Sequence, residues 1–261
     1  DFQNLEIGTA SHDELKDLLT GSDIVINLAG HTRVLESIEN PNLSFTYNVK
    51  GFFDLLMVSK ELGIKKVINA SSGGAIIGDA TPPIDENFLP RPISPYGASK
   101  LCNEAFASAF AGSYGMNVIN LRFSNVYGKY CRNKDSAVAK FIKKIVKKEK
   151  IQVYGDGNQT RDFLFVEDLV DALECCLIKD DLSGVFQLGS GIPTSVNELL
   201  EKLTKVSRTN LEVSYISAQK GEIKKNYANI NKAKNILNWK PSTSLEDGIN
   251  HTYKYLIKNV T

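Results

Sequence analysis

The stretch Ser94-Pro95-Tyr96-Gly97-Ala98-Ser99-Lys100 places a tyrosine and a lysine four residues apart, just inside a predicted helix start. Ser94 is a favourable N-cap, and Pro95 suits the first helical position, where its missing N–H costs nothing. Residues four apart share one helix face. An ammonium one turn away favours the phenolate of a tyrosine, whose ordinary pKa is about 10. The spacing therefore predicts a tyrosine with a lowered pKa, suited to acid–base chemistry.

A second motif, Val67-Ile68-Asn69-Ala70-Ser71-Ser72-Gly73-Gly74, is an apolar strand that runs into hydroxyl residues and glycines. Residues 23–28 form an earlier apolar strand of the kind that is buried on both faces of a parallel sheet, and Ala29-Gly30-His31 follows it. In an open parallel sheet, reacting groups gather at the carboxyl ends of the strands. We therefore expect these segments and Tyr96 to meet at one edge of the sheet.

Composition excludes several classes of protein. The net charge of +1 over 261 residues argues against nucleic-acid binding driven by bulk charge. No apolar run approaches the length of a membrane span. The four cysteines lack metal-ligand spacing and are interpreted as buried thiols of a reducing cytoplasm. We expect a cytoplasmic α/β protein without a metal site, formed by one large domain or by a large and a small one.

The chain resembles the extended short-chain dehydrogenase/reductase family, in particular the NAD-dependent nucleotide-sugar epimerases and dehydratases of the UDP-glucose 4-epimerase type. The resemblance covers nearly the whole chain, and its short motifs occur in the family's order. The matching segments are Leu28-Ala29-Gly30-His31, Asn48-Val49-Lys50-Gly51, Ser71-Ser72-Gly73-Gly74, Pro95-Tyr96-Gly97-Ala98-Ser99-Lys100, Leu121-Arg122-Phe123-Ser124-Asn125-Val126-Tyr127-Gly128, Tyr154-Gly155-Asp156-Gly157 and Arg161-Asp162-Phe163.

The fold that this resemblance implies is a doubly wound parallel sheet of the Rossmann type with a smaller α/β substrate lobe. Residues 1–124 and 159–191 are assigned to the NAD-binding domain, and residues 125–158 and 192–261 to the substrate lobe. The glycine-rich turn that holds a pyrophosphate in this fold does not occur in the sequence. We therefore expect a fragment that lacks the first βαβ portion of the fold.

The resemblance also implies the chemistry. Phenolate Tyr96 takes the proton of the sugar 4-hydroxyl while a hydride passes from C4 to NAD and then returns to the opposite face. Lys100 lowers the pKa of Tyr96 and binds the nicotinamide ribose. The usual position of the catalytic hydroxyl, aligned backward from Gly78-Asp79, holds Gly73, so we favour Ser72 for this role over Ser71.

Ligand contacts are assigned by the same resemblance. His31 is interpreted as a loop histidine and not as a ligand. Asn125 and Arg161 would bind the substrate phosphates, together with Ser72 at the sugar. Gln219 stands where the family has a clamp arginine, which Lys220 could replace as a point charge. The residues expected to contact NAD are Leu28, Ala29, Gly30, Asn48, Ala70, Ser71, Tyr96, Lys100 and Phe123.

Several functions stay open at this point. The leading hypothesis is a UDP-sugar 4-epimerase that forms a homodimer through helices 41–62 and 95–115. Gly73-Gly74-Ala75 cannot titrate, which disfavours a dehydratase or decarboxylase that needs carboxylates there. A nucleotide-sugar dehydrogenase or reductase and a catalytically silent dinucleotide-sensing scaffold are the alternatives. Neither the sugar nor the choice between NAD and NADP follows from the sequence.

Overall fold

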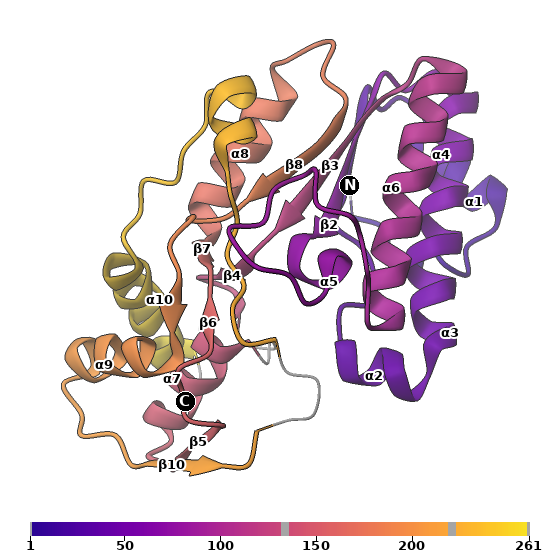
Figure 1. Ribbon diagram of the computed structural model, residues 1–261. Coiled ribbons are helices and arrows are strands. Elements are labelled where there is room, and N and C mark those ends of the chain that lie inside the picture. Colours follow the sequence, from indigo (N-terminus) through magenta and orange to yellow (C-terminus); the bar gives the residue numbers. More distant parts are fainter. Residues whose placement is uncertain (1, 132–135, 219–222, 260–261) are drawn as a thin grey trace. The chain divides into compact units, whose positions relative to one another are not determined.

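The computed structural model describes residues 2–131, 136–218 and 223–259 (Figure 1). Contacts divide the chain into two compact units. The first contains residues 1–79, 86–123 and 176–187, and the second contains residues 80–85, 124–175 and 188–261. Four segments expected in the NAD-binding domain group with the second unit instead, namely residues 80–85, 124, 159–175 and 188–191. In the second unit, strand Phe163–Phe165 pairs with strand Asn125–Tyr127.

The first unit alternates helices and strands. Its elements are α1 (His12–Leu19), β1 (Ile24–Asn27), α2 (Val34–Glu39), α3 (Pro41–Ser44), the π-helix η1 (Phe45–Lys50), α4 (Gly51–Glu61), β2 (Lys66–Ser72), α5 (Gly73–Ile77), α6 (Pro95–Tyr114), β3 (Asn117–Phe123) and most of β8 (Gly184–Leu188). The predicted helix 41–62 is thus one run of three segments, and the helix that begins at Pro95 ends at Tyr114, followed by Gly115 in the left-handed conformation.

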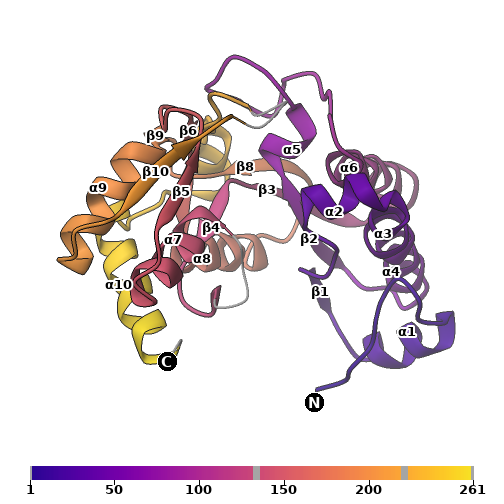
Figure 2. The ribbon, with the colours of Figure 1, turned by 90° about the horizontal axis from the view of Figure 1, so that it is seen from below.

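The four-stranded sheet of this unit has the order β1-β2-β3-β8, and β1, β2 and β3 are parallel. Helices α1, α4 and α6 lie side by side on one face of it (Figures 1 and 2). Their apolar faces bury Leu15, Phe52, Leu56 and Phe110 against Val67 and Val118 of the sheet. This packing fixes the start of α6, and therefore Tyr96, beside the carboxyl ends of the strands.

Strand β1 differs from its prediction. It was expected to be buried on both faces, but only Val25 and Asn27 are buried, whereas Ile24 and Ile26 are 36% and 42% exposed. The physical reason is its place at the edge of the described sheet, where only the face toward the helices is covered.

Three buried asparagines cross the sheet in register. The Asn27 amide donates to the Asn69 side-chain oxygen over 2.9 Å, and the Asn69 amide donates to that of Asn120 over 2.9 Å. These residues are direct partners in the pairing of β1 with β2 and of β2 with β3. Because a slip of one residue would turn a strand's side chains to the other face and break these bonds, the row fixes the strand register and the alignment of the strand ends.

The second unit is built around small sheets and longer helices. Its elements are β4 (Asn125–Tyr127), α7 (Ala137–Val146), β5 (Ile151–Tyr154), β6 (Thr160–Arg161), β7 (Phe163–Phe165), most of α8 (Val166–Leu177), whose last two residues belong to the first unit, β9 (Thr194–Ser195), α9 (Val196–Ser207), β10 (Val213–Ile216), the π-helix η3 (Ala233–Leu237) and α10 (Leu245–Asn259). Strands β4 and β7 pair in parallel, as do β5 and β10, and β6 pairs with β9 antiparallel.

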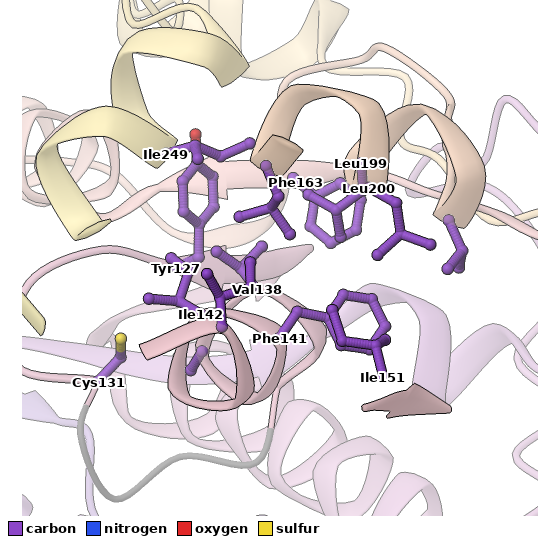
Figure 3. Close-up of a cluster of buried hydrophobic side chains, with 14 of the residues drawn as sticks. Tyr127, Cys131, Val138, Phe141, Ile142, Ile151, Phe163, Leu199, Leu200 and Ile249 are labelled. Carbon is purple, nitrogen blue, oxygen red and sulfur yellow. The ribbon is translucent and has the colours of Figure 1, made fainter. Parts of the chain in front are cut away.

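The core of this unit gathers side chains from α7, α9 and α10 around Tyr127 and Phe163 (Figure 3). Phe141, Ile142 and Ile145 of α7 are buried in it. The apolar side chains of α7 therefore form the face of this helix that points into the core. No helix in the parts of the chain that the structure describes is long and apolar enough to cross a membrane.

The four cysteines are free, but Cys102 is exposed on α6, so the expectation that all four are buried is wrong. Cys102 lies on the outer side of α6, away from the positions that the sheet and α4 cover. Ala105 and Ala109, one and two helical turns further on, are also exposed. A row of small residues therefore marks the outer face of this helix.

Lys66 is a buried lysine at the start of β2, and its ammonium group donates to backbone carbonyls at the end of a helix. Its Nζ donates to the carbonyl oxygens of Cys176, Leu177 and Lys179 at 2.9, 2.9 and 2.6 Å. The last carbonyls of a helix have no intrahelical donor and favour a nearby cation. Lys66 thus satisfies the carboxyl end of α8.

We predict that Lys66→Met lowers the free energy of unfolding by about 3 kcal/mol, because buried carbonyls that lose their donor keep their full desolvation cost. Urea unfolding of Lys66→Met and of Lys65→Met measures this. Lys65 is the exposed neighbour and serves as the matched control. Equal stability of the two variants would contradict the assignment.

Candidate active site

Tyr96 lies in the first turn of α6, as predicted. The Ser94 hydroxyl accepts from the backbone N of Gly97 over 3.1 Å, and Pro95 occupies the first turn. The backbone N–H of Tyr96, which the helix itself cannot satisfy, donates to the Ser37 hydroxyl over 3.2 Å. Ser37 is fully buried on α2 and also donates to the carbonyl of Val34. Sequence reasoning missed this contact, which joins α2 to the start of α6.

The pKa of Tyr96 differs from its expectation. Burial raises it above the ordinary value, while a hydrogen bond with the Ser72 side chain lowers it by a smaller amount. The predicted lowering by Lys100 is wrong for this structure, because burial dominates and the Lys100 ammonium group donates instead to the carbonyl of Ala70 over 2.9 Å. Burial also lowers the pKa of Lys100, to about 8.

The two serines at the end of β2 have different partners. The Ser71 hydroxyl donates to the Glu104 carboxylate over 2.6 Å, and Arg122 binds the same carboxylate through Nε and Nη2 at 2.9 and 2.8 Å. Ser71, Glu104 and Arg122 are all buried. Ser72, by contrast, is hydrogen-bonded to Tyr96. The hydroxyl beside Tyr96 therefore belongs to Ser72, and Ser71 is engaged by a buried ion pair.

Asn48 lies in the π-helical turn of η1 and clamps the loop after β1. Its Oδ1 accepts from the backbone N of His31 over 2.7 Å, and its Nδ2 donates to the His31 carbonyl over 3.0 Å and to the Ser99 hydroxyl over 2.8 Å. Gly30 has φ +151°, and a Cβ there would lie 2.7 Å from Asn48 Oδ1. Only glycine allows this approach, which brings the loop to within reach of Lys100.

The groups around Gly30, His31 and Lys100 fit a bound dinucleotide. The position of a Cβ on Gly30 is 3.6 Å from Lys100 Nζ, so the bare backbone of Gly30 faces a buried amine. His31 Nε2 pairs with Glu36 over 2.9 Å, and its buried Nδ1 has no partner among the described residues. An orphaned buried acceptor, a glycine surface and a buried amine suit a polar planar ligand. Leu28 and Ala29 are exposed on this loop, and Ala70 and Phe123 are half-buried at the strand ends.

Asn125 and Arg161 belong to the second unit. The Asn125 amide donates to the Asp162 carbonyl over 3.1 Å. Arg161 Nη1 donates to the carbonyls of Thr160 and Ile223 at 2.9 and 2.8 Å. Both residues line a pocket of about 230 Å³ within this unit, together with Lys140, Phe141, Gln152, Tyr154 and Gln159. Pockets that hold a whole small-molecule ligand usually have volumes of about 300–1,000 Å³. This pocket is smaller and therefore fits only part of a ligand. Gln219 and Lys220 lie outside the described residues.

Asp162 organises the loops around Arg161 and was not singled out from the sequence. Its carboxylate accepts from the backbone N and hydroxyl of Ser190, both at 2.7 Å, and from the backbone N of Gly191 and of Ala228, both at 3.1 Å. Asp162 is buried, and these donors surround its carboxylate. The only local signal for this role was the position of Asp162 beside Arg161. The partners of its carboxylate are distant in sequence, so no local pattern predicts them.

Comparison with known proteins gives the class. The model of the NAD-dependent epimerase/dehydratase family matches residues 3–189. A putative UDP-glucose 4-epimerase of Methanocaldococcus jannaschii is 35% identical over 99% of this chain and 85% of its own length. The crystal structure of Thermotoga maritima UDP-glucose 4-epimerase with UDP-glucose has a TM-score of 0.94 at 32% identity, covering 100% of this chain and 85% of that one.

A further structure similar to this chain is Bacillus cereus UDP-glucuronic acid 4-epimerase in complex with UDP-glucuronic acid and NAD. Its TM-score is 0.90 at 28% identity, covering 98% of this chain and 81% of that one. The chain therefore belongs to the NAD-dependent epimerase/dehydratase family, with similarity to UDP-sugar 4-epimerases. Its fold is the α/β fold with a parallel sheet of that family.

The lowered pKa of Lys100 has a consequence for stability. Between the folded pKa of about 8 and the ordinary 10.5, the unfolded chain binds more protons than the folded one, so the free energy of unfolding rises with pH. In the cofactor-free protein, we predict that the free energy of unfolding rises by up to about 3 kcal/mol over this pH range. Lys100→Met should abolish this rise. Denaturation across this range measures it, with the exposed Lys147→Met as control. A difference between wild type and Lys100→Met that does not change with pH would contradict the burial of the charge.

Proposed function

We propose that the protein catalyses NAD-dependent epimerisation at C4 of a UDP-linked sugar. The observation that carries the proposal is the hydrogen bond between Tyr96 and Ser72 at the carboxyl end of the parallel sheet, with buried Lys100 one helical turn further on. In this proposal Tyr96 and Ser72 bind the sugar C4 oxygen, and Tyr96 moves its proton. Ser72 orients that proton and favours the phenolate.

The first unit contains the groups that would hold the cofactor. Gly30, Asn48, Ala70 and Lys100 would hold NAD, with Leu28, Ala29, Ser71, Tyr96 and Phe123 as the remaining expected contacts. When bound, NAD accepts and returns the hydride at C4. Lys100 is already fixed by the Ala70 carbonyl, and Asn48 fixes the loop after β1. Both groups are therefore oriented before a ligand binds, which reduces the entropic cost of binding.

The nucleotide part of the substrate is assigned to the second unit. The pocket that Asn125 and Arg161 line also contains Lys140 and no carboxylate among its lining residues. A guanidinium and an ammonium suit a diphosphate. The family also contains dehydratases, but the residues after Ser72 are Gly73, Gly74 and Ala75, which supply no acid or base to expel water. This favours epimerisation, with a dehydrogenase or reductase as the alternative.

A homodimer and a cytoplasmic location are also part of this proposal. The outer face of α6 presents Cys102, Ala105 and Ala109, small residues that allow a second helix to approach closely. Met57 of α4 is 38% exposed. Helices 41–62 and 95–115 would form the contact between the subunits.

The function is tested on the complete gene product that carries this chain. It is incubated with UDP-glucose, UDP-N-acetylglucosamine and UDP-glucuronate in the presence of NAD, and C4 inversion is followed by NMR. We expect inversion of one of them without net NADH release, and its loss in Tyr96→Phe. Accumulating NADH would instead identify a dehydrogenase, and bound NAD without turnover would indicate a silent scaffold.

The two serines provide a matched pair of variants. We expect Ser72→Ala to lower kcat by about 100-fold, because it removes the hydroxyl that shares the proton of Tyr96. Ser71→Ala should leave kcat within a few-fold but lower the free energy of unfolding by about 1–3 kcal/mol, since the buried Glu104 carboxylate loses a donor. Steady-state kinetics and urea unfolding measure both. A reversed pattern would assign the catalytic hydroxyl to Ser71.

A further inference from the structure

Gly73 and Gln187 occupy one small space at the edge of the candidate active site. Gly73 directly follows Ser72 and begins α5. A Cβ on Gly73 would lie 2.3 Å from Gln187 Oε1 and 3.2 Å from Gln187 Nε2. No side chain can occupy position 73 without displacing the carboxamide. The Gln187 carboxamide therefore stands where a side chain adjacent to Ser72 would otherwise begin.

The main chain of Gln187 is fixed at this position. The residue lies near the carboxyl end of β8, which neighbours β3 in the sheet, and is only 2% exposed. Its backbone N donates to the Glu86 carboxylate over 2.6 Å. The flanking residues Phe186 and Leu188 are fully buried and anchor the strand on either side. The main chain of Gln187 is thus held independently of its side chain.

The side-chain amide N–H groups of Gln187 have no acceptor among the described residues, and their nitrogen, Nε2, is buried. Leaving such a donor unpaired is unfavourable, so a buried amide without a partner requires an explanation. Ser72, whose hydroxyl pairs with Tyr96, is the residue directly before Gly73. In the proposed function, a sugar bound by Tyr96 and Ser72 would therefore lie beside Gly73, the residue whose Cβ position is 3.2 Å from this donor.

We propose that Gln187 is a substrate-positioning residue whose Nε2 donates to an oxygen carried on a carbon next to C4 of the sugar. This inference rests on the proposed function, in which Tyr96 and Ser72 take the C4 oxygen. The carbons next to C4 are C3, which carries a hydroxyl, and C5, which carries C6 and its oxygens. The carboxamide can donate to the oxygen on C3 or to one on C6, and it neither gains nor loses a proton near neutral pH. It would therefore orient the sugar ring, and Tyr96 would carry out the proton transfer.

The test compares one variant on three substrates of the complete, NAD-loaded protein. Gln187→Met keeps the length of the side chain and removes the donor. The substrates are a UDP-hexose, a UDP-pentose that lacks C6, and a UDP-3-deoxyhexose. We expect kcat/KM for the UDP-hexose to fall about three- to tenfold, the effect of one neutral hydrogen bond. The loss should vanish for the pentose if the acceptor is on C6, or for the 3-deoxyhexose if it is O3.

Two variants separate positioning from folding. Gly73→Ala should reproduce the substrate-specific loss, because its Cβ displaces the carboxamide while Gln187 is retained. Gln3→Met, at an exposed glutamine, should change nothing. Equal losses on all three substrates would overturn the proposal, because a structural role of Gln187 affects every substrate alike. A loss confined to NAD affinity would also overturn it.

The outcome is distinguishable from a failure of the proposed function. If the wild type inverts C4 but Gln187→Met shows no substrate-specific loss, only the role of Gln187 fails. If the wild type inverts no UDP-sugar, the proposed function fails, and calorimetric dissociation constants of the same three ligands test Gln187 without turnover. Equal affinities of wild type and Gln187→Met for all three, or no binding of any of them, would then overturn this inference too.

Discussion

Every polar side chain that is buried at the carboxyl ends of the parallel strands needs a partner, and this constraint determines the site. The asparagines of β1, β2 and β3 satisfy one another across the sheet. Ser71 and Arg122 satisfy Glu104, and Lys100 binds the Ala70 carbonyl. The groups that remain for a ligand are therefore few. Among the described residues they include the Tyr96–Ser72 pair, His31 Nδ1, Arg122 Nη1 and the Gln187 amide.

The same constraint explains why the buried ion pair lies beside the site. Glu104 is one helical turn after Lys100, and an unpaired carboxylate there would be costly in a buried setting. Arg122 neutralises it with two hydrogen bonds, and Ser71 adds a third. Removing one partner of a buried pair is generally more harmful than replacing the whole pair. The pair keeps Ser71 away from Tyr96 and leaves that position to Ser72.

Local signals in the sequence predicted much of this structure. The Ser94 cap, the helix from Pro95 to Tyr114 and the parallel strand ending at Ser72 follow from propensity and periodicity. The partners of Asp162, the contact of Ser37 with Tyr96 and the approach of Gln187 to Gly73 did not follow. Each of these joins residues tens of positions apart, so no local pattern reveals it. The pKa of Tyr96 was predicted in the wrong direction because burial depends on the whole fold.

The proposed epimerisation requires that a hydride leave C4 and return to the same carbon while Tyr96 and Ser72 hold the C4 oxygen. The most direct measurement uses a UDP-sugar that carries deuterium at C4 and follows the product by NMR. We expect deuterium to remain on C4 of the product, with the configuration at C4 inverted. Deuterium that appears in released NADH or is lost to solvent would contradict it.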